Sequence, residues 1–597
     1  MKSFLKYTLA TICGLLIFTF ITVIVFFTYL VGMTASKSAE TTVKENSVFV
    51  LKLDGSVEER GNQDSPLDFL LSQGDMSVMG LDDIIASIKK AKNHPDIKGI
   101  YLEGGLTSFD YPASAQQVRD ALKDFKKSGK WILAYGEQYT QMGYYVASVA
   151  DTMFLNPTGM IELRGIGGKR EYMTGLYEKL GVKYQVVRVG KYKSAVESVI
   201  RKDMSPENRE QTEAYQRGIW NRMLADIAES RPKLTAEQLD QLVSDSIIAF
   251  ASVGDYKASG LIDILTYPET MKASVNHRLG IEKADTEINQ LLLSDMINVP
   301  DPKEQKGDKV AVYYAYGEII DKATSLFSTG HNIIGKDVVD DLNKLAKDDD
   351  VKAVVLRVNS PGGSAIASEQ IDHAIKMLKE KKPVVVSMGG VAASGGYMIS
   401  AHSDYIFAEP TTITGSIGIF GLIPNYSGLV TDKLGVTFDG TKTNQYTDFE
   451  ENLILGKDNA QELRFMQSYV DRGYETFLQI VADGRKMKRE QVHEIAQGRV
   501  WLATDALPIK LVYTLGSLDD AVKKAAELAK LSEYRQANYP EPESWYEQLM
   551  NQSENRGTNL DAELHELLGD LYQPFVNARR DQQLNRLQAR MSYLLNF

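Results

Sequence analysis

The segment GGYMISAHSDYIFAEPTTITGSIGIFG, residues 395–421, has a counterpart earlier in the chain, GYYVASVADTMFLNPTGMIELRGIGG, residues 143–168. Three further pairs match in the same order: SVFVLKLDGSVEE (Ser47) with KVAVYYAYGEIID (Lys309), DIKGIYLEGG (Asp96) with DVKAVVLRVNSPGG (Asp350), and LGVKYQVVRVGKYKS (Leu180) with LGVTFDGTKTNQYTD (Leu434). From Asp96 onward the copies lie 252 to 254 residues apart. Long self-similarity at a constant spacing indicates an internal duplication, so we predict two tandem copies of one fold.

Each copy alternates short apolar runs with amphipathic stretches. Val384–Val386 is β-branched, whereas residues 371–378 carry apolar side chains at helical spacing. Such alternation is typical of βαβ units with a parallel sheet, and therefore of an α/β protein. A polar, proline-containing segment from Val299 links the copies. The predicted parts are an N-terminal anchor, a first repeat, a second repeat and a polar helical extension, at residues 1–33, 47–298, 309–535 and 536–597 respectively.

The N-terminus predicts a membrane anchor. No charged residue occurs between Lys6 and Lys37, and the run from Tyr7 to Met33 is apolar. This run can cross a hydrocarbon core as a helix and is longer than the apolar region of a cleavable signal peptide. Because Lys2 and Lys6 precede it, the positive-inside rule places this end in the cytoplasm. We predict a single-pass inner-membrane protein, with the bulk of the chain in the periplasm if the source is a Gram-negative bacterium; a long signal peptide that is removed is the alternative.

Composition excludes several classes of function. The 597 residues carry a formal net charge of −12, which argues against a nucleic-acid-binding protein. The single cysteine, Cys13, excludes a disulfide framework and a cysteine-cluster metal site. The seven histidines show no H-E-x-x-H spacing. We therefore expect no cysteine-cluster metal site, no zincin-type metal site and no nucleic-acid partner.

Two glycine-containing segments of the second repeat are candidates for a site. In NSPGGS, Gly362 and Gly363 let the backbone approach a ligand and expose N–H groups that can hold an oxyanion. In TGSIGI, from Thr414, a backbone edge and the hydroxyl of Ser416 can line the same site. Each segment is also compatible with an ordinary turn.

Ser394, within VAASGGY, is the candidate nucleophile. It precedes an apolar helical stretch, and its small neighbours leave the hydroxyl within reach of a peptide. A helix-capping role is the alternative. His402 follows eight residues later, about 12 Å away along one helix, and is too distant to serve as its base.

A lysine can act as the base if burial keeps its amine neutral. The segment GKYKS offers Lys193 and Lys191, and composition does not choose between them. Comparison of the repeats aligns Ser394 with Met142 of the first copy. It aligns Lys193 with Thr447 of the second. Each copy thus lacks the group that the other has, as expected if a duplicated enzyme kept one functional group per copy, or if two unrelated substitutions occurred.

Four motifs together resemble those of the signal peptide peptidase A (protease IV) family in its long, duplicated form: GKYKSAVE from Gly190, SPGGS from Ser360, ASGGY from Ala393 and TGSIG from Thr414. The resemblance covers nearly the whole chain, although Val199 departs from the family's usual continuation. It implies a ClpP/crotonase-like αβ fold in each repeat.

The resemblance also implies roles for single residues. Ser394 would be the nucleophile and Lys193 the general base. Ser416 would orient the lysine amine. The oxyanion and substrate loop would comprise Gly362 and Gly363, together with Gly395 beside the serine.

The function implied is that of a serine endopeptidase that degrades cleaved signal peptides at the membrane without a cofactor. Its partners would be hydrophobic peptides, the lipid bilayer and further copies of the chain, in a homotetramer. Two alternatives stay open. A crotonase-type acyl-CoA enzyme would share the scaffold, and a catalytically silent membrane scaffold would share the anchor.

Overall fold

The computed structural model describes residues 40–61, 78–246, 248–283, 285–302, 306–321, 331–541 and 588–590, with Gly14, Phe18, Thr19, Ile21 and Thr22. The predicted anchor, 1–33, lies almost entirely outside the described residues, as does most of the predicted extension, 536–597. Among the described residues, no helix combines the length and apolar character needed to cross a bilayer.

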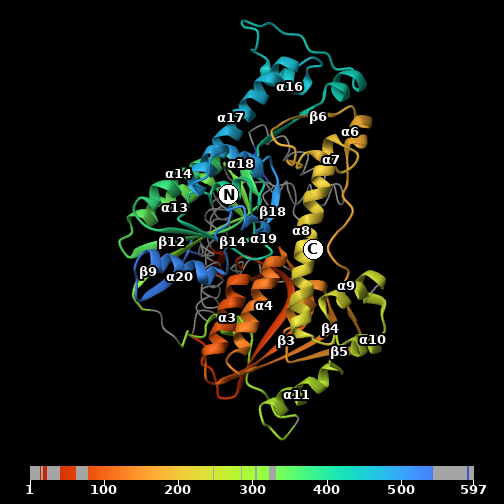
Figure 1. Cartoon of the computed structure of the whole chain (residues 1–597), viewed down its shortest axis with the longest axis vertical. Coiled ribbons are helices and arrows are strands. Elements are labelled where there is room, and N and C mark those ends of the chain that lie inside the picture. Colours follow the sequence, from red (N-terminus) through yellow and green to blue (C-terminus); the bar gives the residue numbers. More distant parts are fainter. Residues whose placement is uncertain are drawn as a thin grey trace, which may run out of the picture.

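The first repeat is built on a parallel sheet with strand order β2-β1-β3-β4-β5-β7, and β8 also pairs with β1. Helices alternate with its strands (Figure 1). The strands are β1 (Ser47–Glu58), β2 (Val78–Gly80), β3 (Ile97–Phe109), β4 (Trp131–Tyr139), β5 (Thr152–Ile161), β7 (Ile264–Leu265) and β8 (Gln290–Leu291). The helices include α3 (Leu81–Asn93), α4 (Pro112–Lys126), α5 (Gln141–Ala147), α8 (Pro206–Ser230), α9 (Ala236–Asp245), α10 (Val253–Ser259), α11 (Met271–Arg278) and α12 (Leu293–Ile297).

The second repeat has the strand order β18-β16-β14-β12-β9-β20, with β15 between β14 and β19. Its pairs are parallel except β16 with β18. The strands are β9 (Asp308–Tyr316), β12 (Val351–Ser360), β14 (Val384–Ala393), β15 (Tyr405–Ala408), β16 (Ile413–Gly415), β18 (Val500–Leu502), β19 (Thr514–Leu515) and β20 (Tyr534–Tyr539). The helices include α13 (Gly335–Lys347), α14 (Ala365–Lys379), α15 (Gly395–Met398), α16 (Phe449–Leu455), α17 (Ala460–Arg485), α18 (Arg489–Ile495), α19 (Ala503–Ala506) and α20 (Leu518–Leu528).

The central strands are covered on both faces, which explains their continuous β-branched sequences. β14 is buried along its whole length, and β12 is buried at every residue but Lys352. Alternate side chains of these strands enter two different cores, one with α13 and α14 and one with α20. A parallel sheet buried in this way needs apolar residues on both faces.

The two repeats share specific contacts as well as topology. The backbone N–H of Ile132 donates to Asp151 Oδ2 (2.8 Å), as that of Val384 does to Asp404 Oδ2 (2.9 Å). The hydroxyl of Tyr144 donates to the carbonyl of Leu261 (2.8 Å), as that of Tyr397 does to Leu511 (2.9 Å). The chain therefore consists of two tandem copies of one α/β fold.

These shared contacts correct one alignment made from the sequence. Tyr397 lies three residues after Ser394, and its equivalent Tyr144 lies three residues after Gln141. The counterpart of Ser394 is therefore Gln141 rather than Met142. The Gln141 side chain accepts from the backbone N–H groups of Arg164 (2.9 Å) and Gly165 (3.1 Å).

The predicted helical extension is wrong for the residues described within it. Residues 536–539 continue β20, which pairs in parallel with β9 and forms the edge of the sheet, and residues 588–590 form β21. The side of β9 that faces away from β12 offers backbone partners to this segment, which a polar sequence does not reveal.

A third sheet joins the repeats. Its order is β11-β10-β13-β21-β17-β6, and the strands are β6 (Lys183–Arg188), β10 (Glu318–Ile320), β11 (Asn332–Ile334), β13 (Gly362–Ser364), β17 (Phe420–Asn425) and β21 (Gln588–Arg590). β6 of the first repeat pairs antiparallel with β17 of the second, with Arg188 opposite Phe420. The first repeat thereby carries the segment after β6 into the second repeat.

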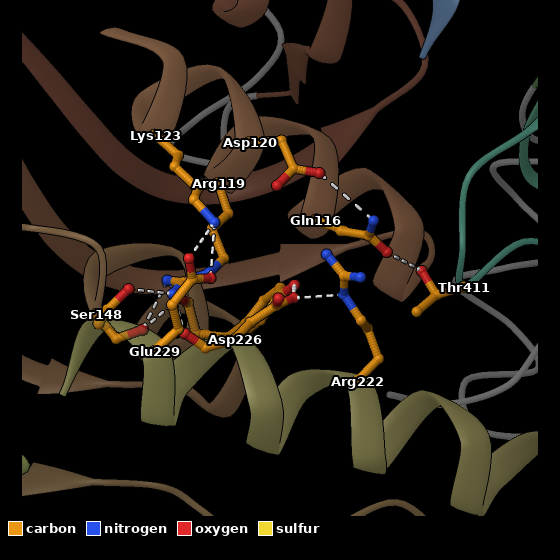
Figure 2. Close-up of polar contacts among 11 residues, drawn as sticks. Gln116, Arg119, Asp120, Lys123, Ser148, Arg222, Asp226, Glu229 and Thr411 are labelled. Carbon is orange, nitrogen blue, oxygen red and sulfur yellow. Dashed lines mark hydrogen bonds and ion pairs between the residues drawn. The ribbon is translucent and has the colours of Figure 1, made fainter. Parts of the chain in front are cut away.

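Helix α8 also spans both repeats (Figure 1). Near the C-terminal end of α8, the buried guanidinium of Arg119 in α4 joins α4, α5 and α8 (Figure 2). It donates to the carbonyl of Tyr145 (2.8 Å) and to the hydroxyls of Ser148 (2.8 Å) and Ser230 (2.6 Å). Towards the N-terminal end of α8, Gln211 accepts from the backbone N–H of Val500 in β18 (2.9 Å).

Candidate active site

Lys193 and Ser394, 201 residues apart in sequence, meet inside the protein. Nζ of Lys193 lies 2.8 Å from Oγ of Ser394. It also lies 3.0 Å from both Oγ and the carbonyl oxygen of Ser416. The relative exposures of Lys193 and Ser394 are 1% and 0%. Three of the residues singled out from the sequence therefore form one buried cluster.

Burial decides the charge of the lysine amine. Desolvation lowers the pKa of Lys193 well below its ordinary value of 10.5. The amine can therefore be neutral and carry a lone pair, which a basic group requires. Lys191, the other candidate, is exposed, and its Nζ lies 5.1 Å from the centroid of the Tyr192 ring.

Close backbone contacts hold the turn that presents Lys193. Gly190 has φ +97°, and a Cβ there would lie 2.4 Å from the carbonyl of Gln497. A Cβ on Gly498 would lie 2.6 Å from that of Lys193. Glycine is therefore required at both positions. The side-chain amide of Gln211 donates to Tyr192 O and Ser194 Oγ (both 3.1 Å), which links this turn to α8. Gln211 and Gly498 were missed from the sequence because no local motif marks them.

Ser394 sits in a strained turn between β14 and α15. Its φ of +55° is uncommon for a residue with a side chain and occurs at functional turns. Its backbone N–H donates to the carbonyl of Gly415 (2.8 Å), next to Ser416. Gly395 follows directly and opens α15. A Cβ on Gly396 would lie 2.5 Å from the carbonyl oxygen of Ser360, so only glycine lets these two loops touch.

The glycine loop lies beside this turn. Gly362 has φ +97°, and its N–H donates to Oγ of Ser360 (3.1 Å). A Cβ on Gly363 would lie 2.0 Å from the carbonyl oxygen of Ile319. The loop continues as β13, which pairs with β10 and, antiparallel, with β21. The structure thus brings both glycines of the predicted oxyanion loop to the serine turn.

His402 makes a separate interaction. Its Nδ1 lies 2.8 Å and 2.9 Å from the two carboxylate oxygens of Asp372, a residue of α14. The amine of Lys193 is therefore the basic group in contact with Ser394.

A serine hydroxyl that contacts a buried amine, carried on α/β repeats, defines a serine hydrolase. Residues 124–281 and 376–532 match peptidase family S49, once in each repeat, and residues 309–412 match the Clp protease family. The chain belongs to peptidase family S49: it is a serine peptidase built from two tandem S49 repeats, the second of which also matches the Clp protease family.

Relatives at the level of whole sequences agree. The chain is 38% identical over 478 residues to protease 4 of Salmonella typhi, covering 79% of this chain and 75% of that protein. It is 33% identical over 515 residues to protease 4 of Haemophilus influenzae, covering 84% and 82%. A shorter match, 36% identical over 228 residues, covers 38% of this chain and 65% of an Enterococcus faecium protein named as a signal peptide peptidase.

Proposed function

We propose that this serine peptidase is a membrane-anchored endopeptidase that degrades cleaved signal peptides, with Ser394 as the nucleophile and Lys193 as the general base. The observation that carries the proposal is the 2.8 Å contact between the buried amine and the serine hydroxyl. A nucleophilic serine needs an adjacent base that is deprotonated at the working pH.

The partners of the amine support proton transfer from Ser394 to Lys193. The carbonyl oxygen of Ser416 can only accept a hydrogen bond, so it takes one N–H of the neutral amine. Oγ of Ser416 can accept the second N–H. The lone pair is then free to accept the proton of Ser394. Ser416 therefore orients the amine for its role as a base.

The remaining steps follow from this geometry. As Lys193 takes the proton, Ser394 Oγ bonds to the peptide carbonyl carbon. Backbone N–H groups of Gly363 and Gly395 stabilise the oxyanion, while Gly362, whose N–H is held by Oγ of Ser360, shapes the loop. The protonated lysine gives its proton to the leaving amine, and the peptide C–N bond breaks. Lys193 then activates a water molecule that releases the acyl group from the serine.

Residues 588–590 indicate how a peptide is held. They form β21 between β13 and β17, with Arg590 opposite Gly362 and Ala589 opposite Gly363. An extended peptide in the position of β21 would form backbone hydrogen bonds with the oxyanion loop. An enzyme that recognises the peptide backbone can bind peptides of varied sequence. This mode of binding suits the degradation of diverse apolar segments. Hydrophobic signal peptides are the substrates proposed, in line with the name of the Enterococcus faecium relative.

The experiment is a cleavage assay. The full-length protein in detergent is incubated with a synthetic signal peptide, and products are identified by mass spectrometry. We expect internal cuts within the apolar region, and covalent labelling of Ser394 by a fluorophosphonate probe. An intact peptide together with an unlabelled serine would refute the proposal.

The location is also part of the proposal. The uncharged run from Tyr7 to Met33, after Lys2 and Lys6, supports a single inner-membrane anchor with the repeats in the periplasm. We expect deletion of residues 1–33 to move the protein from the membrane pellet to the soluble fraction. Retention of the deleted form in the pellet after a high-salt wash would contradict the anchor.

We further propose that copies assemble, as a tetramer by family resemblance. In the first repeat, the segment from Leu180 places β6 against the second repeat. The matching segment from Leu434 leaves Leu434, Val436 and Phe438 exposed by 67%, 43% and 60%. By analogy, it would pack on the first repeat of another copy. We expect Phe438→Glu to lower the mass measured by light scattering, and an unchanged mass would contradict this contact.

A further inference from the structure

The ladder between β12 and β14 is interrupted just before the active site. Val358 is opposite Met388, but Ser360 is opposite Ala392, so three residues of β14, Gly389 to Val391, face the single residue Asn359 of β12. Such a bulge breaks regular hydrogen bonding and redirects the strand. The redirected strand leads into the turn of Ser394.

The side chain of Asn359 bridges this interruption in the ladder. Oδ1 of Asn359 accepts from the backbone N–H of Val391 (3.1 Å). Its Nδ2 donates to Oε2 of Glu59 and to Oδ2 of Asp110, both at 3.0 Å. Carboxylates accept hydrogen bonds, so the NH₂ group must face the two acids and the amide oxygen must face Val391. The orientation of this buried amide is therefore fixed.

Both acids belong to the first repeat. Glu59 follows β1 and forms a buried ion pair with Arg357 of β12 (Oε1 to Nε, 2.6 Å). Asp110 follows β3, and its Oδ1 accepts from the backbone N–H of Tyr111 (2.8 Å) and from Oγ of Ser114 (2.5 Å). Each carboxylate is thus held independently of Asn359.

The first repeat also shapes the bulge. A Cβ on Gly390 would lie 2.3 Å from the Cβ of Tyr111. A Cβ on Gly389 would lie 3.1 Å from Oε2 of Glu59 and 3.2 Å from the Cβ of Asn359. Glycine is therefore required at position 390, and at position 389 it leaves room for Glu59 and Asn359 to approach the backbone closely.

Asn359 links the starts of both active-site loops. It directly precedes Ser360, where the glycine loop begins, and it holds Val391, three residues before Ser394. We propose that Asn359 is a positioning residue that sets the register between the oxyanion loop and Ser394, and that Glu59 and Asp110 of the first repeat hold it in place. The first repeat then aligns the nucleophile as well as supplying the lysine.

This inference rests on the proposed role of Ser394, and its test compares rates of covalent labelling of that residue in the full chain. A small fluorophosphonate probe is used, together with kcat and KM for a peptide. We expect Asn359→Ala to slow labelling and to reduce kcat by about 10- to 100-fold, as a small misplacement of reacting groups does. KM should change by less than about twofold, because peptide binding does not use this amide.

A double-mutant cycle separates positioning from a general loss of structure. Asp110→Ala changes only the first repeat, and we expect it to slow labelling in the wild-type background but to have no further effect in Asn359→Ala. If Asn359→Ala does not fold, the labelling rate of Asp110→Ala by itself tests the inference. The matched control is Thr411→Val, which removes another buried bond between the repeats, from Thr411 Oγ1 to Gln116 Oε1 (2.8 Å; Figure 2). It should label at the wild-type rate.

Labelling of folded Asp110→Ala at the wild-type rate, or fully additive effects in the cycle, would overturn the inference. Absence of labelling in the wild-type protein would instead refute the proposed nucleophile, so the two failures are distinguishable.

Discussion

Replacing Ser394 by alanine is expected to reduce peptide cleavage to the assay background, a loss on the order of 10⁶-fold where a serine nucleophile is removed. The change deletes one oxygen atom from a fully buried side chain whose partner is Lys193. The fold should therefore persist. Cleavage of a fluorogenic hydrophobic peptide measures the loss, and circular dichroism verifies the fold.

Ser403→Ala is the matched control for this substitution. Ser403 is also a buried serine beyond α15, and its Oγ donates to the carbonyl of Ser400 (2.8 Å). It should keep full activity. Cleavage by Ser394→Ala at the wild-type rate would show that another group attacks the substrate.

Replacing Lys193 by methionine is expected to lower kcat by about 10²–10⁴-fold, the usual contribution of a general base. Methionine has a similar length and an apolar end, so it fits the buried site without an amine. The serine hydroxyl then has no group to accept its proton. Single-turnover kinetics with the same peptide measures the effect. Lys191→Met is the control, and an equal loss there would reassign the base to that exposed lysine.

The depressed pKa of Lys193 predicts two pH effects. Activity requires the neutral amine, so kcat/KM should rise as the pH increases through that lowered pKa and fall at lower pH, where the amine is protonated.

The second effect concerns stability. Between the pKa of Lys193 in the folded protein and the ordinary value of 10.5, the lysine is protonated in the unfolded chain but neutral in the folded one, so the stability of the wild-type protein rises with pH in that window. The difference in free energy of unfolding between Lys193→Met and wild type should shift in favour of wild type as pH increases. A difference independent of pH would contradict the buried neutral amine.

Much of the fold could be predicted from the sequence because its signals are local or repeated. The matching segments predicted two tandem copies, and alternating runs such as Val384–Val386 predicted parallel strands. Both predictions are confirmed by the family matches and the strand order. The alignment of Ser394 with Met142 was wrong by one residue, since a gap in a short repeat cannot be placed without the contacts that Tyr144 and Tyr397 share.

The sequence by itself determined that this chain is a duplicated α/β protein with a serine, a lysine and a glycine loop available for catalysis. Only the tertiary structure decided that Lys193 rather than Lys191 meets the serine, and that Gln211 and Asn359 hold the loops that present them. The physical reason is the distance along the chain over which each interaction acts. Periodicity and turn chemistry act over a few residues, whereas the charge of an amine and its contact with a serine 201 residues away depend on which strands pair across the two repeats.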